Sequence, residues 1–174
     1  MPEPLQPECL FAALADAGVD YVLIGGLAGV LHGSPAMTND ADIVPSPTPA
    51  NLDRLATALG DLRARLRSER APEGVEFDPH PELLASMAML NMTTRCGDLD
   101  LSFIPAGTQG YDDLVERAVT FNVRDLVIPV ASLADVIRSK EAADRPKDRA
   151  TLTILYALRD ELTVRPPGED PPGG

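Results

Sequence analysis

The spacing of apolar residues along the chain predicts an α+β order of helices and strands. Apolar residues at helical spacing favour a first helix over Leu5–Ala17, which Gly18 would end. Leucines that recur every three or four residues predict a longer helix from Ala50 to about Arg67. Short apolar runs predict strands, and these runs are Tyr21–Ile24, Ala41–Val44, Leu90–Arg95, Leu99–Ile104, Thr120–Val123 and Leu126–Val130.

The remaining segments complete a mixed sheet flanked by helices. Prolines, a glycine and charges interrupt every pattern from Ser68 to Pro81, so we expect a loop there. We expect one domain over residues 1–162, with the C-terminal helices packed on the sheet, and a disordered Pro/Gly-rich tail over residues 163–174. Further segments with helical character are Leu27–Leu31, Leu83–Ala88, Tyr111–Val119, Ser132 to about Ala143 and Pro146 to about Leu162.

Length and composition agree with an independently folding domain. The chain has 174 residues, of which 44% are hydrophobic, which is enough to build a core without staples. The sequence contains neither an apolar stretch long enough for a membrane span nor a secretory signal, so we expect a cytoplasmic protein. Cys9 and Cys96 lack the spacing of a zinc site, and we expect both to be reduced thiols.

The charge pattern is acidic overall but locally basic. A net charge of -12 argues against general nucleic-acid affinity, because such binding grows with the phosphates that Lys and Arg neutralise. The first basic run would form the solvent face of the helix that ends near residue 67, where it could meet an RNA backbone. The two runs are Arg63, Arg65, Arg67 and Arg70, and Arg138, Lys140, Arg145, Lys147 and Arg149.

The candidate chemistry begins where the first strand ends. Gly25 and Gly26 follow this strand and precede a short helix, so their backbone N–H groups could hold a phosphate. Asp40 and Asp42 then occur two residues apart at the start of an extended segment. Side chains at that spacing point to the same face of a sheet, where both carboxylates could bind divalent metal ions.

A third carboxylate fits the same site. In the run after Gly97, apolar residues alternate with polar ones, so Asp100 is expected on the polar face of the sheet. Three carboxylates, with Asp40 and Asp42 bridging two Mg²⁺ ions, could support nucleotidyl transfer from an NTP. Taken singly, each feature has a plainer interpretation: a solvated strand end, a tight turn or an edge-strand charge.

These residues resemble a known fold. Gly25-Gly26, the Asp40-x-Asp42 pair and Asp100 look like the nucleotidyltransferase fold of the DNA polymerase β type. The stretches Ile24–Pro35 and Thr38–Ile43 resemble the AbiEii and MenT branch of nucleotidyltransferase toxins, as does the late run Ser139–Asp148. The resemblance covers about residues 21–158.

The resemblance implies roles for further residues. In such toxins a lysine on the late helix contacts the nucleotide phosphates, which matches Lys140, and an aspartate after it supports the site, which matches Asp148. Thr38, two residues before Asp40, could touch the triphosphate or cap a turn, and Ser139 and Arg145 are weaker candidates. Plainer interpretations remain open: Lys140 could pair with an aspartate four residues later, and Asp148 could complement a helix dipole.

One feature departs from the resemblance. Many relatives carry an arginine shortly before the threonine, where this chain has Ala36-Met37. One expected phosphate contact is therefore missing, which leaves the nucleotide preference and the level of activity open.

The resemblance implies a toxin of a toxin–antitoxin system that adds nucleotides to the 3′ end of tRNA and has a cognate antitoxin partner. A second interpretation within enzymes is AMP transfer to an aminoglycoside or lincosamide antibiotic, since an acidic chain would attract a cationic drug. AMP transfer to a partner protein and a catalytically idle binding module are further alternatives.

Overall fold

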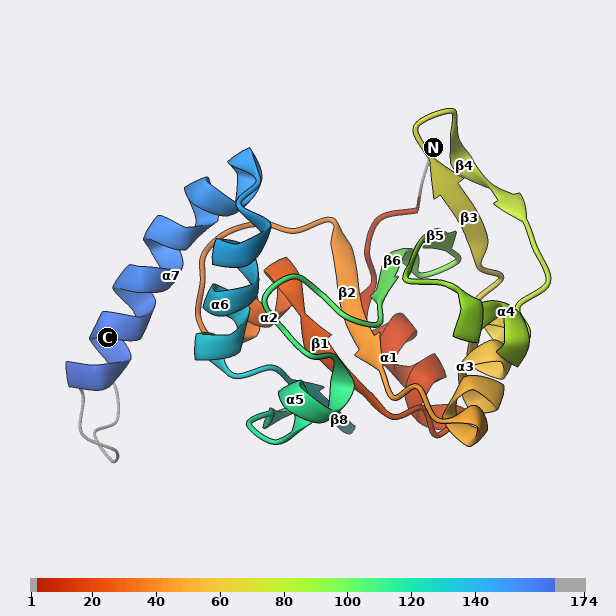
Figure 1. Cartoon of the computed structure of the whole chain (residues 1–174), viewed down its shortest axis with the longest axis horizontal. Helices are drawn as coiled ribbons and strands as arrows, with labels where there is room; N and C mark the ends of the chain where they lie inside the picture. Colours follow the sequence, from red (N-terminus) through yellow and green to blue (C-terminus); the bar gives the residue numbers. More distant parts are fainter. Residues whose placement is uncertain (1–2, 165–174) are drawn as a thin grey trace.

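The computed structural model describes residues 3–164 and builds them around an eight-stranded mixed sheet (Figure 1). Neighbouring strands follow the order β4-β3-β5-β6-β2-β1-β8-β7. The strands are β1 (Tyr21–Ile24), β2 (Asp40–Pro45), β3 (Arg65–Ser68), β4 (Ala71–Glu76), β5 (Met89–Thr94), β6 (Gly97–Ser102), β7 (Val119–Val123) and β8 (Leu126–Val130). The helices are α1 (Pro7–Asp16), α2 (Gly25–Leu31), α3 (Pro49–Asp61), α4 (Pro81–Ser86), α5 (Tyr111–Val115), α6 (Leu133–Ala143) and α7 (Pro146–Val164).

Strand β2 lies inside the sheet between β1 and β6. It is antiparallel to β1 and parallel to β6, so the middle of the sheet mixes both kinds of pairing. The C-terminal helices α6 and α7 lie at one end of the molecule, and the hairpin of β3 and β4 lies at the other (Figure 1). The mixed α+β architecture expected from the sequence is confirmed.

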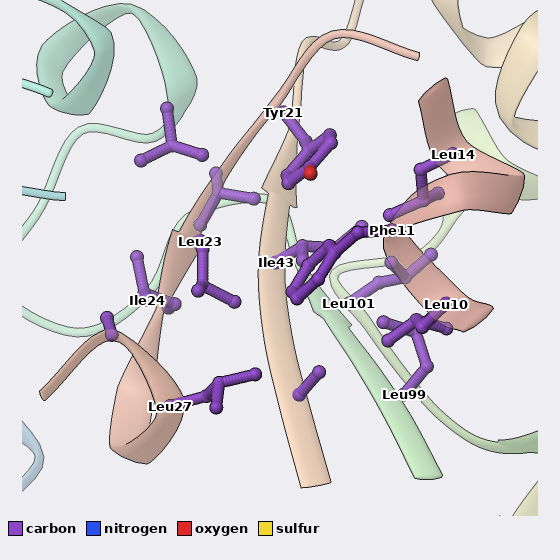
Figure 2. Packing of buried hydrophobic residues seen from close by; sticks show 14 of the residues in the cluster. Leu10, Phe11, Leu14, Tyr21, Leu23, Ile24, Leu27, Ile43, Leu99 and Leu101 are labelled. Carbon is purple, nitrogen blue, oxygen red and sulfur yellow. The ribbon is translucent and has the colours of Figure 1, made fainter. Parts of the chain in front are cut away.

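The core forms where α1 covers the middle strands. Leu10, Phe11 and Leu14 of α1 are almost completely buried and face the strands (Figure 2). The rings of Phe11 and Tyr21 are stacked with their centroids 6.1 Å apart. Burial of apolar area, at about 25 cal/mol per Å², makes this layer stabilising. The buried strand residues opposite α1 include Leu23, Ile43, Leu99 and Leu101.

Most predicted elements are confirmed with small shifts at their ends. The strand Tyr21–Ile24 and the hairpin around Cys96-Gly97 occur as expected. The side chain of Ser132 accepts a hydrogen bond from the backbone N–H of Asp135 at 3.1 Å and caps α6. Helix α5 ends at Val115, earlier than predicted. Helix α7 extends to Val164, and the rest of the expected tail, residues 165–174, lies outside the described residues.

Two predictions between residues 50 and 81 are wrong. The helix α3 ends at Asp61, and Arg63 adopts a left-handed backbone conformation with φ of 53° that no helix continues through. The chain then forms β3 and β4, where the sequence suggested the end of a helix and a loop. The basic run is therefore not a helix face: Arg65 donates to the carbonyl of Gly74 and pairs with Glu76 inside the new hairpin.

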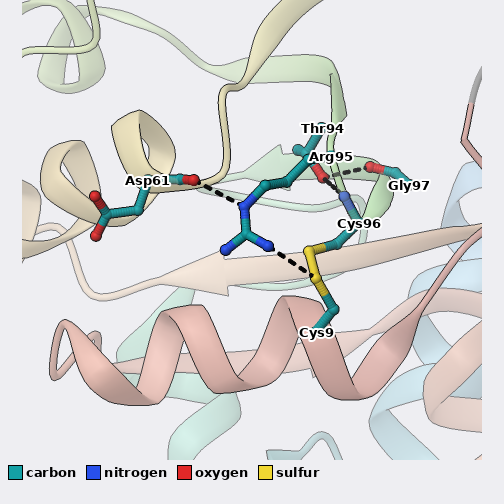
Figure 3. The surroundings of a disulfide bond; sticks show 6 residues. All are labelled: Cys9, Asp61, Thr94, Arg95, Cys96 and Gly97. Carbon is teal, nitrogen blue, oxygen red and sulfur yellow. Dashed lines mark hydrogen bonds between the residues drawn. A yellow bond between two sulfur atoms is a disulfide. The ribbon is translucent and has the colours of Figure 1, made fainter.

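The prediction that Cys9 and Cys96 are reduced thiols is also wrong. The two residues form a disulfide that links α1 to the turn between β5 and β6 (Figure 3), with their Cα atoms 5.7 Å apart. The guanidinium of Arg95 lies beside this bond, with Nη1 3.3 Å from the Cys9 Sγ, and donates from Nε to the carbonyl of Asp61. Sequence spacing gave no sign of the pairing, because 87 positions separate the cysteines.

Candidate active site

The three predicted carboxylates meet on one face of β2 and β6. The parallel register pairs Asp42 with Asp100, and the residues between the acids, such as Ala41 and Leu99, are fully buried on the opposite face. One carboxylate oxygen from each of Asp40, Asp42 and Asp100 lies within 4.8 Å of the others. Alternation along two neighbouring strands is thus sufficient to build the cluster.

A fourth carboxylate belongs to the same face. Asp98 is paired in register with Asp40, and it precedes Asp100 by two residues on β6. Sequence reasoning missed Asp98, although the alternation that singled out Asp100 applies equally to it. Arg67 of β3 contacts both: its Nη2 donates to Asp100 Oδ1 at 2.9 Å, and its Nε lies 3.4 Å from Asp98 Oδ2.

The glycine pair packs directly against the acids. Gly25 has φ of 73°, and a Cβ at this position would collide with the Asp42 carboxylate. A Cβ on Gly26 would approach within 3.0 Å of the Thr38 hydroxyl oxygen. That hydroxyl donates to Asp40 Oδ1 at 3.0 Å. The glycines therefore leave room for the carboxylates, and Thr38 orients one of them.

Asp40 and Asp42, but not Asp100, line a cleft of about 480 Å³ whose other wall is cationic. The first wall includes Gly25, Gly26, Thr38, Asp40 and Asp42. Side chains from α6 and from the start of α7 form the opposite wall, and those that carry polar or charged groups are Ser139, Lys140, Arg145, Lys147 and Thr151.

The two residues that the resemblance matched on the late helices touch each other. Lys140 Nζ lies 3.3 Å from Asp148 Oδ1, and the Asp148 side chain is fully buried. Arg145 Nε donates to Asp148 Oδ2 at 2.7 Å. Burial by itself raises the pKa of Asp148, but the hydrogen bond from Arg145 and the charge of Lys140 outweigh it and hold that pKa below its ordinary value. Asp148 thus anchors the cationic wall and does not line the cleft itself.

Lys147 is the cation that sequence reasoning underrated. It is exposed, lines the cleft and makes no ion pair with the described residues, whereas Lys140 is paired and mostly covered. The charge of Lys147 lowers the pKa of Asp42 more than that of Lys140 does. Its place in the second basic run was the only signal in the sequence.

Burial and mutual repulsion perturb the acids. Burial, followed by the charges of Asp40 and Asp100, raises the pKa of Asp42 to about 7. Burial also raises the pKa of Asp100, against the opposing charge of Arg67. Carboxylates that resist ionisation together are suited to a divalent cation, which would neutralise them. Hard oxygen ligands at this separation fit Mg²⁺.

The segment that replaces the arginine of the resembling toxins also lines the cleft. Ala36 and Met37 lie at its edge, and the Met37 side chain is 95% exposed. This edge is therefore apolar, with Met89 on β5 nearby in the same lining.

No protein-family model matches this sequence, and no curated protein matches it. The fold does have a solved counterpart: the lincosamide antibiotic adenylyltransferase LnuA, in a crystal structure with bound lincomycin. The comparison gives a TM-score of 0.57 at 16% identity and covers 90% of this chain and 99% of LnuA. The chain has a nucleotidyltransferase fold.

The same fold comparison includes a protein from Thermotoga maritima that is assigned as a nucleotidyltransferase, with a TM-score of 0.48 and 14% identity over 92% of this chain and 96% of that one. The match to LnuA confirms the expected nucleotidyltransferase fold. The narrower resemblance to the AbiEii and MenT toxins stays a prediction. No helix within residues 3–164 combines the length and apolar character that crossing a membrane requires.

Proposed function

We propose that this protein is a metal-dependent nucleotidyltransferase that moves a nucleoside monophosphate from an NTP to an acceptor hydroxyl. The observation that carries the proposal is a cluster of three carboxylates, two of which line a cleft whose opposite wall carries cationic side chains. A triphosphate with bound divalent ions carries the charges that such a cleft complements.

The carboxylate wall would hold the metal. Asp40, Asp42 and Asp100 are the proposed ligands of two Mg²⁺ ions, which when bound would neutralise the charge that develops around the α-phosphate. Asp100 would also position the acceptor hydroxyl. Thr38 would keep Asp40 in place, and the backbone N–H groups of Gly25 and Gly26 would contact phosphate oxygens.

The cationic wall would hold the leaving group. In the proposed reaction the acceptor oxygen bonds to the α-phosphorus, and the bond from that phosphorus to the oxygen of the β-phosphate breaks. Pyrophosphate leaves with the bonding electrons, and the proton of the acceptor hydroxyl passes to solvent water. Lys140 and Lys147 would offset the charge on the pyrophosphate, and Asp148 would keep Lys140 in position.

For the acceptor we propose the 3′ end of tRNA, in a toxin that a cognate antitoxin protein restrains. The motif resemblance through Ser139–Asp148 supports this choice. Because tRNA and NTPs are cytoplasmic substrates, the proposal places the reaction in the cytoplasm.

A lincosamide is the second candidate acceptor, favoured by the match to LnuA over 99% of that enzyme's length. The net charge of -12 also suits a cationic drug better than an RNA backbone.

Incubation of the purified protein with each α-labelled NTP, Mg²⁺ and either total tRNA or lincomycin tests both candidates. Asp42→Ala is the matched inactive variant. We expect label on tRNA, resolved on a denaturing gel, that is absent with the variant.

The other outcomes are equally informative. Label on lincomycin and not on tRNA would mean that the acceptor is the antibiotic, and the proposed nucleotidyl transfer would still hold. Mg²⁺-dependent NTP binding without label on either compound would direct the search to protein acceptors. Absence of any Mg²⁺-dependent NTP binding would refute the proposal and favour an idle binding module.

A further inference from the structure

Arg67 reaches the candidate active site from a strand that does not border the acids. It lies on β3, which is separated from β6 by β5, and its side chain extends to the carboxylates of Asp98 and Asp100. Only 28% of the Arg67 side chain is exposed, and about a fifth of each aspartate. At this degree of burial an ion pair is screened far less than a surface pair.

This contact is not needed to hold β3 in the sheet. The backbone of β3 pairs with β5, and the neighbouring Arg65 ties β3 to β4 through the carbonyl of Gly74 and the carboxylate of Glu76. Within residues 3–164, the ion pairs of Arg67 are with the two acids of β6 alone. Two arginines two positions apart therefore have different partners, one in the hairpin and one in the site.

The contact is selective between the two oxygens of Asp100. Arg67 Nη2 donates a hydrogen bond to Oδ1, whereas Oδ2 makes no hydrogen bond with the residues that the structure describes. The second contact, to Asp98 Oδ2, is an ion pair at 3.4 Å without a hydrogen bond, and it attracts the guanidinium electrostatically toward β6. One oxygen of Asp100 is thus engaged and the other is free.

We propose that Arg67 is the positioning residue of the acceptor half of the site: it holds Asp100 so that Oδ2 faces the acceptor hydroxyl, with Asp98 as its second anchor. The inference rests on the proposed nucleotidyl transfer, which it deepens. Arg67 does not touch the reacting atoms and acts through Asp100. A carboxylate held by such a neighbour keeps the geometry on which transfer depends, whereas a freely rotating one loses it.

The test compares Arg67→Met with Arg65→Met, a matched variant on the same strand that leaves the acids untouched. Pyrophosphate release from an NTP is the rate readout, with water serving as the acceptor oxygen where no other acceptor is supplied. Mg²⁺-dependent NTP binding is measured separately for every variant. We expect Arg67→Met to lower kcat about 30-fold while the Kd for NTP changes less than twofold, and Arg65→Met to leave both within twofold.

Two further variants separate positioning from stability. Arg67→Lys restores one charge without the fork and should recover part of the lost kcat. In an Asp100→Asn background, Arg67→Met should have no further effect on the rate, because the residue through which it acts is gone.

The outcomes distinguish this inference from the underlying function. If wild-type protein shows no Mg²⁺-dependent NTP binding, the proposed function itself fails, and this inference fails with it. If wild-type protein binds NTP and releases pyrophosphate but Arg67→Met keeps its kcat, or loses kcat and NTP binding equally, the positioning role alone is overturned. A further loss from Arg67→Met in the Asp100→Asn background would likewise reduce Arg67 to a structural residue.

Discussion

Burial and the like charges of neighbouring carboxylates both raise the pKa of Asp42 in the folded protein. A carboxyl whose pKa rises from 3.8 to about 7 binds a proton in the folded state that the unfolded state has already released. The contribution of this group to the free energy of unfolding is therefore greatest below pH 4 and is lost as the pH rises through 7. Without metal, the site works against stability at neutral and alkaline pH.

Asp42→Asn should accordingly stabilise the metal-free protein at pH 8. A shift of this size corresponds to on the order of 2 to 4 kcal/mol after allowance for partial solvent access, and the gain should shrink toward pH 4. Urea unfolding in EDTA at pH 5 and pH 8 measures it. A variant no more stable than wild type at pH 8 would contradict the repulsion described for the acids.

Substitution of each of the two lysines of the cationic wall should have a different effect. Lys147→Met removes an unpaired charge that faces the cleft, so we expect KM for NTP to rise about tenfold with little change in thermal stability. Lys140→Met also leaves the buried Asp148 without one of its partners, so it should lower the melting temperature as well. Steady-state kinetics paired with thermal unfolding separates the two, and equal melting temperatures would count against the anchoring role of Asp148.

At the scale of elements, the missed hairpin shows where patterns in the sequence stop being informative. Strand β4 is an edge strand and mostly exposed, so it needs no apolar alternation and tolerates Pro72 and Gly74. Leu66 falls at helical spacing from Leu62 although a turn at Arg63 separates them. The spacing of leucines does not reveal that the helix ends here, because the residues that follow pair with strands that lie further along the chain.

The sequence predicted the site residues whose positions depend on local structure, and it did not predict contacts between separate elements. Asp40, Asp42 and Asp100 could be placed because alternation along buried strands fixes the face of each side chain. The contacts of Arg67 and the pairing of Lys140 with Asp148 depend on how separate elements pack, which spacing does not encode.

The disulfide between Cys9 and Cys96 should stabilise the fold by joining α1 to the hairpin that carries Asp100. A cross-link across 87 positions restricts the unfolded chain, and we expect reduction to lower the free energy of unfolding by about 2 to 5 kcal/mol. Urea unfolding with and without a reductant tests this. The double variant Cys9→Ser/Cys96→Ser is the control and should not respond to reductant, and an unchanged midpoint for reduced wild type would show that the link contributes nothing.

For the whole molecule, the acidic net charge and the cationic wall have separate consequences. The overall charge repels polyanions at long range, while the cleft attracts a triphosphate at short range. Binding of NTP with Mg²⁺ at a hundred times its Kd should add about 2.7 kcal/mol of stability, which for a chain of this size raises the melting temperature by about 5 to 10 °C.

EDTA should abolish that increase, and so should Asp42→Ala, which removes a proposed metal ligand. Thermal unfolding monitored with and without Mg²⁺ provides the measurement. An equal increase in EDTA would mean that the nucleotide binds without the carboxylates.

The position of β2 also determines when activity can arise during synthesis. The acids Asp40 and Asp42 leave the ribosome early, but Asp100 comes on β6 and Lys147 opens the last helix. Strand β1, which pairs with β2, also pairs with β8 near the other end of the fold. A nascent chain therefore carries an incomplete cleft until almost all described residues have been translated, and nucleotide binding can serve as a report that folding has finished.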